Sequence, residues 1–372
     1  MHEDLKIAEK LKVLIVLDVL PERNGVGSFY TDLREYLEKY LKDVRIFGPK
    51  KNNSTNIFSI AMPGDNTQRL YFPRISVLSN FIKDFNPDII ILPTPGPYGL
   101  IGFKIAKNLN IPILSVLHND YDSMASLFWI SHIGKLIGAF GKFVNSLFFR
   151  NSYLVLIVND GMKYLARELG SERIETIGTP LAKIFVDRPI VPIKRQVKKV
   201  LYAGRLSIEK GIQKIISAAR AIPDLEFVFA GEGPLRKELE NQSKNLKNVT
   251  FLGWISRNEL VDRIDECQIM VLPSIIETFG TSALEGMSRG RIIIISDESG
   301  ITSWSSLDNM YINNGEFASL TDTIKYVIHL DEFDRAKLCN KVPRVINKFN
   351  QDTIYRWTEI IIQTYKSRHF RL

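Results

Sequence analysis

The stretch KVLYAGRLSIEKGIQKIISAARA, residues 199–221, contains in order an apolar run, a short charged loop and a helical period. The apolar run at 199–203 is typical of a strand that is covered on both faces in a parallel sheet. After the loop GRLSIEKG, apolar residues recur at helical spacing from 212 to 221. Strand, loop and helix in this order predict a Rossmann-like α/β unit, in which ligands bind at the carboxyl ends of the strands.

The same alternation extends along the chain on both sides of this stretch. Before it, apolar runs predict strands at residues 12–18, 44–47, 88–92, 112–117 and 154–158. After it, they predict strands at residues 226–230, 249–252, 268–272 and 292–295. Helical periods separate these runs, and this alternation indicates parallel sheets with right-handed crossovers.

The length of 372 residues indicates two domains, because a single hydrophobic core rarely extends beyond roughly 250–300 residues. Residues 187–199 carry two prolines and five basic residues without a long apolar period, so we interpret them as a linker. We therefore predict one Rossmann-like domain at residues 1–190 and a second at residues 191–350. We expect the C-terminal helix, residues 351–372, to pack back on the first domain.

The composition is that of a globular protein with a mild excess of basic residues. The net charge of +8 is spread evenly over the two halves, which suits phosphate-bearing ligands or an anionic membrane surface and gives no reason to expect nucleic acid. Cys267 and Cys339 form no C-x-x-C pair, so they predict neither a zinc site nor a disulfide framework. Without a signal-like N-terminus or an apolar run of about 18 residues, we expect a cytoplasmic location.

Three loops carry residues suited to a phosphate ligand. In the first, Gly25 and Gly27 lie between a predicted strand and its helix, where backbone N–H groups and the helix dipole favour an anion. Tyr30 stands where a dinucleotide fingerprint has its third glycine, so a dehydrogenase is disfavoured and a plain tight turn is the alternative. In the second, Arg205 and Lys210 flank one loop, and two cations there suit a diphosphate unless they are simply solvated.

The third loop is PSIIETFGTSALEG, residues 273–286, and it follows a predicted buried strand. Phe279, Gly280 and Thr281 mark the start of a helix, whose free N–H groups can hold a phosphate or sugar hydroxyls. Glu277 lies in the loop and Glu285 lies eight positions later inside the helix, where carboxylates can accept hydrogen bonds from sugar hydroxyls. The alternative interpretation is a helix start that favours acids, with Glu285 on a solvated face.

Taken together, these loops resemble those of the retaining glycosyltransferases of family 4. Members of this family have the GT-B fold, in which two Rossmann-like domains face each other across a cleft. The patterns G-R-L-x-x-x-K-G, A-G-x-G-P and E-x7-E occur here in the family's order, and the resemblance covers essentially the whole chain. It implies that Arg205 and Lys210 bind the diphosphate of a nucleotide-sugar donor and that Glu277 contacts the transferred sugar.

The resemblance also assigns the remaining site residues. A histidine that ends a strand of the first domain lies beside the transferred sugar in the family, and here that residue is His118. The catalytic residues that the resemblance implies are His118, Arg205, Lys210 and Glu277. The donor-binding residues that it implies are Gly25, Gly27, Gly231, Gly233, Phe279, Gly280, Thr281 and Glu285. The segment DESGI, residues 297–301, departs from the glycine-rich stretch of the family, and Asn24 replaces the first glycine of its G-G-x-G loop.

No metal and no cofactor other than the nucleotide sugar is expected. Asp120, Tyr121 and Asp122 form a D-x-D, which holds a metal in another class of glycosyltransferase. It lies in the domain that is not expected to bind the donor, and cations and helix dipoles can assist departure of the diphosphate instead.

The acceptor side is predicted from residues 123–159, which contain no Asp or Glu. The residues that we assign to a membrane or acceptor surface are Trp129, Ile133, Lys135, Phe140 and Lys142. An apolar and basic helix of this kind lies on anionic membranes, and the alternative is an amphipathic helix packed on its own domain. Because family members with lipid-linked acceptors have similar surfaces, we expect a lipid or polyprenol-linked glycan as acceptor, at the inner face of the cell membrane.

We therefore predict transfer of a sugar from a nucleoside-diphosphate sugar to a hydroxyl, and the resemblance implies retention of the anomeric configuration. The alternatives are a soluble acceptor, a sugar-nucleotide epimerase or phosphorylase on the same fold, and a non-catalytic subunit that binds the donor.

Overall fold

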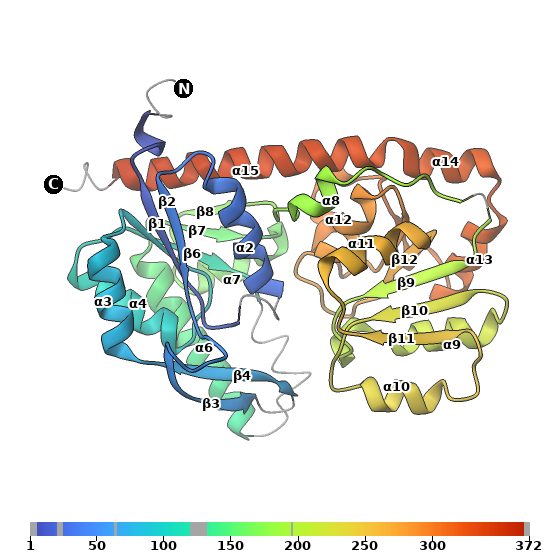
Figure 1. The fold of residues 1–372 in the computed structure, drawn as a ribbon, viewed down its shortest axis with the longest axis horizontal. Helices are drawn as coiled ribbons and strands as arrows, with labels where there is room; N and C mark the ends of the chain where they lie inside the picture. The colour runs from blue at the N-terminus through green and yellow to red at the C-terminus, as the bar shows by residue number, and fades with distance from the viewer. Residues whose placement is uncertain (1–5, 21–24, 63–64, 120–131, 195, 368–372) are drawn as a thin grey trace. The chain divides into compact units, whose positions relative to one another are not determined.

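A computed structural model of the protein describes residues 6–20, 25–62, 65–119, 132–194 and 196–367. The chain divides into two compact units, shown in Figure 1. Unit 1 comprises Met1–Pro180 and Gln351–Leu372, and unit 2 comprises Leu181–Asn350. Unit 2 thus begins before residue 190, the boundary expected from the sequence.

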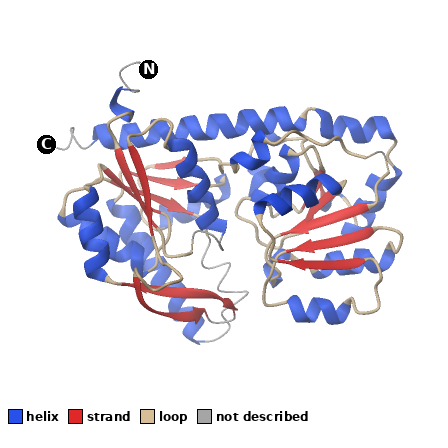
Figure 2. Ribbon diagram, viewed as in Figure 1, coloured by secondary structure: helices blue, strands red, loops and turns tan. Residues whose placement is uncertain are grey.

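Unit 1 is built around a six-stranded parallel sheet with the strand order β2-β1-β5-β6-β7-β8 (Figure 2). Its strands are β1 Lys12–Val16, β2 Asp43–Phe47, β5 Ile89–Leu92, β6 Ile113–Leu117, β7 Leu154–Ile157 and β8 Ile174–Thr176. Its helices are α2 Gly25–Leu37, α3 Ile75–Phe85, α4 Pro97–Asn108, α6 His132–Asn151 and α7 Lys163–Glu168. The second half of α15 Val342–Ser367 also belongs to this unit, and its Trp357 is fully buried in the same core as Ile15 and Leu33.

Unit 2 contains a second six-stranded parallel sheet, with the order β11-β10-β9-β12-β13-β14. Its strands are β9 Lys199–Ala203, β10 Glu226–Ala230, β11 Val249–Gly253, β12 Ile269–Leu272, β13 Ile292–Ile295 and β14 Ile312–Asn313. Its helices are α8 Lys183–Asp187, α9 Gln213–Ala221, α10 Arg236–Gln242, α11 Arg257–Glu266, α12 Thr281–Ser288, α13 Leu320–His329, α14 Glu332–Asn340 and the start of α15. The two parallel sheets confirm the predicted α/β class with two Rossmann-like halves.

Each sheet has one point where the strand order reverses. In unit 1 this switch point lies between β1 and β5, and in unit 2 it lies between β9 and β12. Loops that leave two such neighbouring strands run to opposite faces of the sheet and leave a crevice at the carboxyl ends, where ligands of open α/β sheets bind. These two places are therefore the candidate ligand sites of the fold.

One element of unit 1 was not predicted. Strands β3 Asn56–Met62 and β4 Asp65–Pro73 form an antiparallel hairpin outside the main sheet. The rings of Phe58 and Phe72 stack at 4.5 Å across this hairpin. Most of β3 is exposed although its sequence, NIFSIAM, is largely apolar, and Ile57 and Phe58 are more than half accessible.

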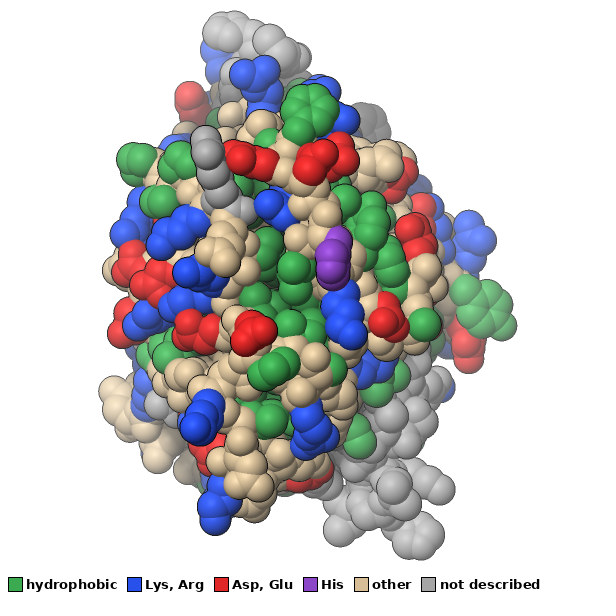
Figure 3. Space-filling model, turned by 90° about the vertical axis from the view of Figure 1, so that its right-hand side faces the viewer, with side chains coloured by type: hydrophobic (Ala, Val, Ile, Leu, Met, Phe, Trp, Pro, Cys, Tyr) green, Lys and Arg blue, Asp and Glu red, His purple; other side chains and the backbone are tan. Residues whose placement is uncertain are grey.

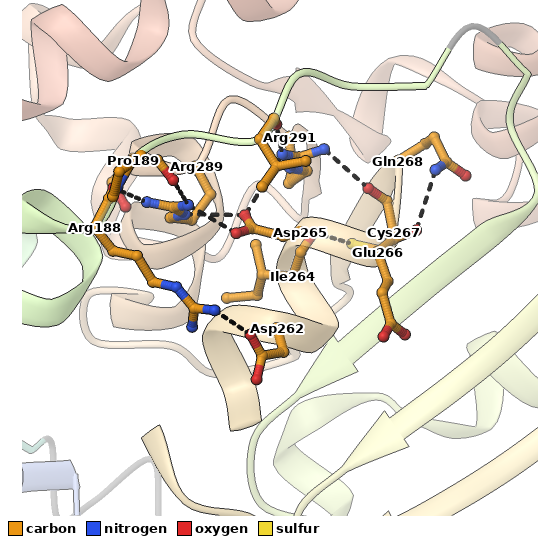
Figure 4. A network of polar contacts seen from close by, with 12 residues as sticks. Arg188, Pro189, Asp262, Ile264, Asp265, Glu266, Cys267, Gln268, Arg289 and Arg291 are labelled. Carbon is orange, nitrogen blue, oxygen red and sulfur yellow. Dashed lines mark hydrogen bonds and ion pairs between the residues drawn. The ribbon is translucent and has the colours of Figure 1, made fainter. Parts of the chain in front are cut away.

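A buried ion pair fastens the segment before β9 to unit 2, as Figure 4 shows. Arg289 binds both carboxylate oxygens of Asp265, at 3.0 and 2.7 Å, and also donates to the carbonyl oxygens of Arg188 and Pro189 at 2.6 Å. Arg291, which is likewise buried, donates to the carbonyl oxygen of a residue two positions farther along, Val191. These contacts explain why residues 188–191, at the start of the predicted linker, are part of unit 2.

The surface view in Figure 3 shows one face of the molecule. Lys and Arg side chains lie among Asp and Glu side chains on this face, around a central group of hydrophobic ones. The mixture of signs here agrees with the mild, evenly spread basic excess of the sequence.

Candidate functional site

The loops that follow β9 and β12 meet at the switch point of unit 2. Lys210 Nζ lies 2.7 Å from Glu277 Oε2, and the two side chains are only 22% and 14% exposed. The carbonyl oxygen of Glu209 accepts hydrogen bonds from the amides of Ile275 and Ile276, at 2.7 and 3.2 Å. The second and third predicted loops therefore form one structure, with a cation and a carboxylate at its centre.

Gly211 makes this junction possible. Its φ is +60°, a backbone conformation that other residues adopt only with strain. A Cβ atom on Gly211 would lie 2.1 Å from the carbonyl oxygen of Pro273. The glycine after Lys210 is thus required both by its own backbone and by the close approach of the loop that carries Glu277.

The turn after β10 joins the same assembly through its two glycines. A Cβ atom on Gly231 would lie 1.9 Å from the carbonyl oxygen of Gly204, and one on Gly233 would lie 2.3 Å from that of Leu206. The amide of Leu206 donates to the carbonyl oxygen of Glu232 at 2.9 Å. The predicted donor-binding turn therefore lies directly against the loop that carries Arg205.

Residues 297–301 support the Glu277 loop from the side of β13. The amide of Gly300 donates to the carbonyl oxygen of Glu277, and that of Ile301 donates to the carbonyl oxygen of Phe279, both at 2.9 Å. The hydroxyl of Ser299 donates to the same Phe279 oxygen at 3.2 Å. The segment that departs from the family's glycine-rich stretch therefore still makes an ordered backbone contact with the loop.

The helix α12 begins where the sequence predicts. Gly280 is its N-cap, with φ +100°, and Thr281 at its first position is exposed. The side chain of Phe279 is 4% exposed and contacts Trp304 and Phe349 in the core, so only its backbone can face a ligand. Glu285 is half-buried one turn into the helix.

Two residues outside the predicted set fix Arg205. The hydroxyl of Tyr202 donates to the carbonyl oxygen of Arg205 at 2.6 Å, at the base of the loop. Glu209 is 7% exposed, its Oε1 accepts from the hydroxyl of Ser207, and its charge acts on Arg205. Burial lowers the pKa of the Arg205 guanidinium and Glu209 opposes this, so the cation is retained in a largely desolvated place.

The switch point of unit 1 is occupied by Asp18, which the predicted set does not include either. Its carboxylate accepts hydrogen bonds from Thr94 Oγ1 at 2.7 Å and from the amides of Gly96 and Tyr98 at 3.0 and 2.6 Å. Burial raises the pKa of Asp18 to about 6, against the lowering effect of these hydrogen bonds. A Cβ on Gly96 would lie 2.4 Å from the Asp18 carboxyl, so the carboxylate fills the crevice.

His118 follows β6 and is 8% exposed. Its Nε2 lies 2.8 Å from the hydroxyl of Tyr30, and the ring of Phe29 packs edge-on against it at 5.0 Å. Burial lowers the pKa of His118 to about 3, so the imidazole is neutral at physiological pH. Tyr30, which stands where a dinucleotide fingerprint has its third glycine, is thus the hydrogen-bond partner of His118.

The glycine loop of unit 1 differs from the prediction. Gly25 and Gly27 lie in the first turn of α2 rather than in a loop before the helix, because the helix begins at Gly25. The first N–H groups of a helix are free of intrahelical partners, so these amides stay suited to an anion. Asn24 lies outside the described residues.

The predicted membrane surface is described only in part. Leu136, Phe140 and Phe143 of α6 are exposed by 70%, 43% and 65%, while Lys142 is half-buried. Ile133 and Lys135 belong to α6, but their side chains, like all of Trp129, lie outside the described residues. No helix within the described ranges combines the length and the apolar character needed to cross a membrane.

No metal site is found in the part of the chain that the structure describes, since no three His, Cys, Asp or Glu side chains there lie together in a suitable way. The D-x-D at residues 120–122 lies outside the described ranges. Cys267 and Cys339 are both buried free thiols.

Two family models match consecutive parts of the chain: "Glycosyltransferase Family 4" over residues 23–181 and "Glycosyl transferases group 1" over residues 184–341. Alpha-monoglucosyldiacylglycerol synthase of Streptococcus pneumoniae is 24% identical over 307 residues, which are 74% of this chain and 68% of that protein. Sucrose-phosphate synthase of Thermosynechococcus elongatus has a similar fold, with a TM-score of 0.75, 17% identity and coverage of 96% of this chain and 100% of that one. Anabaena Alr3699/HepE, solved with UDP and glucose, gives a TM-score of 0.66 at 16% identity, with coverage of 96% and 100%.

Proposed function

The chain belongs to the family 4 glycosyltransferases, retaining enzymes that transfer a sugar from a nucleotide sugar, and we propose that it binds its donor at the switch point of unit 2 and glycosylates a lipid-linked acceptor. The observation that carries the first part is the Lys210–Glu277 pair, which joins the loops of β9 and β12 across that switch point. The second part rests on α6 and on one relative.

The donor diphosphate lies against Arg205 and Lys210 in this proposal. A departing nucleoside diphosphate gains negative charge, and cations already fixed in a desolvated place stabilise that charge without reorganisation. Lys210 is held at 2.7 Å by Glu277, so it is in position before the donor arrives. The Anabaena protein was solved with UDP, which supports a nucleoside diphosphate as ligand of this fold.

The sugar and nucleoside parts of the donor occupy the surrounding loops. We assign Glu277 and the amides of Phe279, Gly280 and Thr281 to the hydroxyls of the transferred sugar, since a carboxylate beside free helix amides offers both acceptors and donors. Glu285 contacts the ribose, and the turn at Gly231 and Gly233 lies near the base. Holding the donor and acceptor in reacting geometry then supplies part of the rate acceleration.

The acceptor is a lipid or a polyprenol-linked glycan, bound at the cytoplasmic face of the membrane. Leu136, Phe140 and Phe143 expose an apolar surface on a helix without acidic residues, which suits a bilayer of anionic lipids. The name of the Streptococcus relative, a monoglucosyldiacylglycerol synthase, supports a lipid acceptor. We also assign His118, whose imidazole is neutral, to the catalytic residues, as the family resemblance implies.

The test is a donor screen with purified protein, a panel of nucleoside-diphosphate sugars and a membrane lipid extract. Released nucleoside diphosphate and new glycolipid are followed by mass spectrometry. The proposal predicts nucleotide release together with a lipid heavier by one sugar. An altered sugar nucleotide formed without acceptor would indicate an epimerase instead, and donor binding without turnover in any acceptor mixture would contradict the catalytic role.

A further inference from the structure

Unit 1 contains a cavity of about 560 Å³ between α2 and the loop that follows β2. Its walls include the cationic residues Arg34, Lys50 and Lys51 and the apolar residues Leu20, Ile46 and Pro49. It lies at the carboxyl end of β2, the edge of a parallel sheet where ligands bind. Its volume is within the usual range of small-molecule sites, about 300–1,000 Å³.

The loop that carries the two lysines is held in shape by its own hydrogen bonds. The hydroxyl of Thr55 donates to the carbonyl oxygen of Gly48 at 2.9 Å, and the amide of Lys50 donates to Asn56 Oδ1 at 3.2 Å. Asn53 adopts a left-handed backbone with φ +56°, and its amide donates to the carbonyl oxygen of Lys50 at 3.1 Å. The backbone of this loop is thus ordered before a ligand binds, which reduces the backbone entropy lost on binding.

Arg34 faces the cavity from α2. Its Nε lies 3.3 Å from Glu38 Oε1, an i,i+4 pair with side chains 38% and 50% exposed. Such exposed pairs are weak, so an anion with two or three oxygens competes well for the guanidinium. None of the described residues that line the cavity is acidic, so its field favours negative charge.

We propose that this cavity binds a phosphate-bearing group of the acceptor. The inference rests on the proposed function, which it extends from a lipid-linked acceptor in general to one that carries a phosphate. One arginine and two lysines line this cavity, and three cationic residues suit a doubly charged phosphate better than a single carboxylate. The apolar wall of Leu20, Ile46 and Pro49 takes the group to which the phosphate is attached.

The experiment follows phosphate binding in the full-length protein labelled with ¹⁵N. Backbone amide resonances of residues 48–52 are recorded while inorganic phosphate, glycerol 1-phosphate or uncharged glycerol is added. We expect saturable shifts with both phosphate compounds and none with glycerol. Lys50→Gln and Arg34→Gln should each weaken binding about tenfold, the effect of one charge-assisted hydrogen bond.

Lys39→Gln is the matched control, because Lys39 is exposed just after α2 and does not line the cavity. It should bind glycerol 1-phosphate like the wild type. Lys50 is exposed on its loop, so Lys50→Gln leaves the fold intact and keeps the test valid if Arg34→Gln misfolds. Absence of saturable shifts, or equal affinity of the Lys50→Gln and wild-type proteins, would overturn the inference.

A second arm identifies the source of the phosphate. Flotation with phosphatidylglycerol and phosphatidylcholine vesicles is compared for the wild type and Lys50→Gln. If Lys50→Gln floats less than the wild type with phosphatidylglycerol vesicles but not with phosphatidylcholine vesicles, the phosphate belongs to a lipid headgroup. If its flotation is unchanged while its affinity for glycerol 1-phosphate is lost, the phosphate belongs to a soluble ester. Calorimetry with UDP-glucose and other nucleotide sugars separates the two proposals. If phosphate binding fails and a donor still binds, only the inference fails. If phosphate binds and no donor does, the proposed function fails, and with it the assignment of the phosphate to an acceptor.

Discussion

The two switch points have the same topology and opposite chemistry. In unit 1, Asp18 is 5% exposed and its carboxylate is bound by donors of the chain itself, from Thr94, Gly96 and Tyr98. In unit 2, Lys210 and Glu277 remain partly accessible and bind chiefly each other. The comparison teaches that strand order creates a crevice but side chains decide whether the fold fills it or a ligand does.

The largest expected effect follows from removing a cation of unit 2. Arg205→Ala or Lys210→Ala should lower kcat/KM about 10²–10³-fold, because each removes a fixed donor to the developing charge of the diphosphate. The free energy of unfolding should change little. Steady-state kinetics and thermal unfolding measure both quantities. Lys214→Ala, an exposed lysine on α9, is the control and should keep the wild-type kinetics.

Removing the carboxylate of unit 1 should instead affect stability. Asp18→Leu leaves the Thr94 hydroxyl and the Gly96 and Tyr98 amides without their acceptor in a buried place, which should cost roughly 3 kcal/mol in the free energy of unfolding. Urea unfolding measures this cost. Asp18→Asn keeps one acceptor oxygen and should cost less. If Asp18→Leu lost donor affinity without losing stability, the contrast between the two switch points would be wrong.

A third prediction concerns the pH dependence that His118 causes. Its folded pKa of about 3 lies below the unfolded value of about 6.5, so the unfolded state binds the proton more tightly. The stability from this residue is therefore fully present above about pH 6.5 and is lost as the pH falls toward 3. Thermal unfolding at several pH values, compared with His118→Asn, should show a flatter profile for the variant. An NMR titration of His118 with a midpoint near 6.5 would contradict the assignment.

The smallest expected effect is on the exposed face of α6. Phe143→Ser and Leu136→Ser should each weaken binding to anionic vesicles a few-fold, because each removes roughly 1.5–3 kcal/mol of apolar side-chain transfer that a bilayer only partly recovers. Vesicle flotation measures the effect. Tyr164→Ser is the control, since Tyr164 is 78% exposed on α7, outside this surface. Equal flotation of all variants would leave α6 as a purely structural helix.

Local patterns were sufficient to predict that the loops after β9, β10 and β12 belong to one candidate site. A Cβ atom on Gly211, Gly231 or Gly233 would clash with a backbone carbonyl oxygen. Each of these three positions therefore requires glycine. Arg205 and Lys210 belong to the same short loop, which one continuous stretch of sequence identifies because it lies between an apolar run and a helical period. The loop that carries Arg205 and Lys210 was therefore predicted from one local pattern, whereas the roles of Gly231 and Gly233 came from the family resemblance.

Long-range contacts were not recognisable in the same way. The partners of Asp18 follow another strand, and Tyr30 meets His118 from a distant helix, so no periodicity connects them. Arg289 and Arg291 resemble ordinary basic residues in the sequence, although both are buried against Asp265. The β3–β4 hairpin was not predicted because it pairs outside the main sheet and exposes apolar residues of β3 such as Ile57 and Phe58, so it shows no alternation of buried apolar and exposed polar residues.

The most direct test of the central claim, that the switch point of unit 2 holds the donor diphosphate, is calorimetric titration with the nucleotide sugar that the donor screen selects. The wild type, Lys210→Ala and Asp18→Asn are compared under one buffer condition. We predict that Lys210→Ala binds the donor at least about tenfold more weakly, the loss of one charge-assisted contact, while Asp18→Asn binds it like the wild type. Unchanged donor affinity in Lys210→Ala, or a larger loss in Asp18→Asn, would contradict the claim.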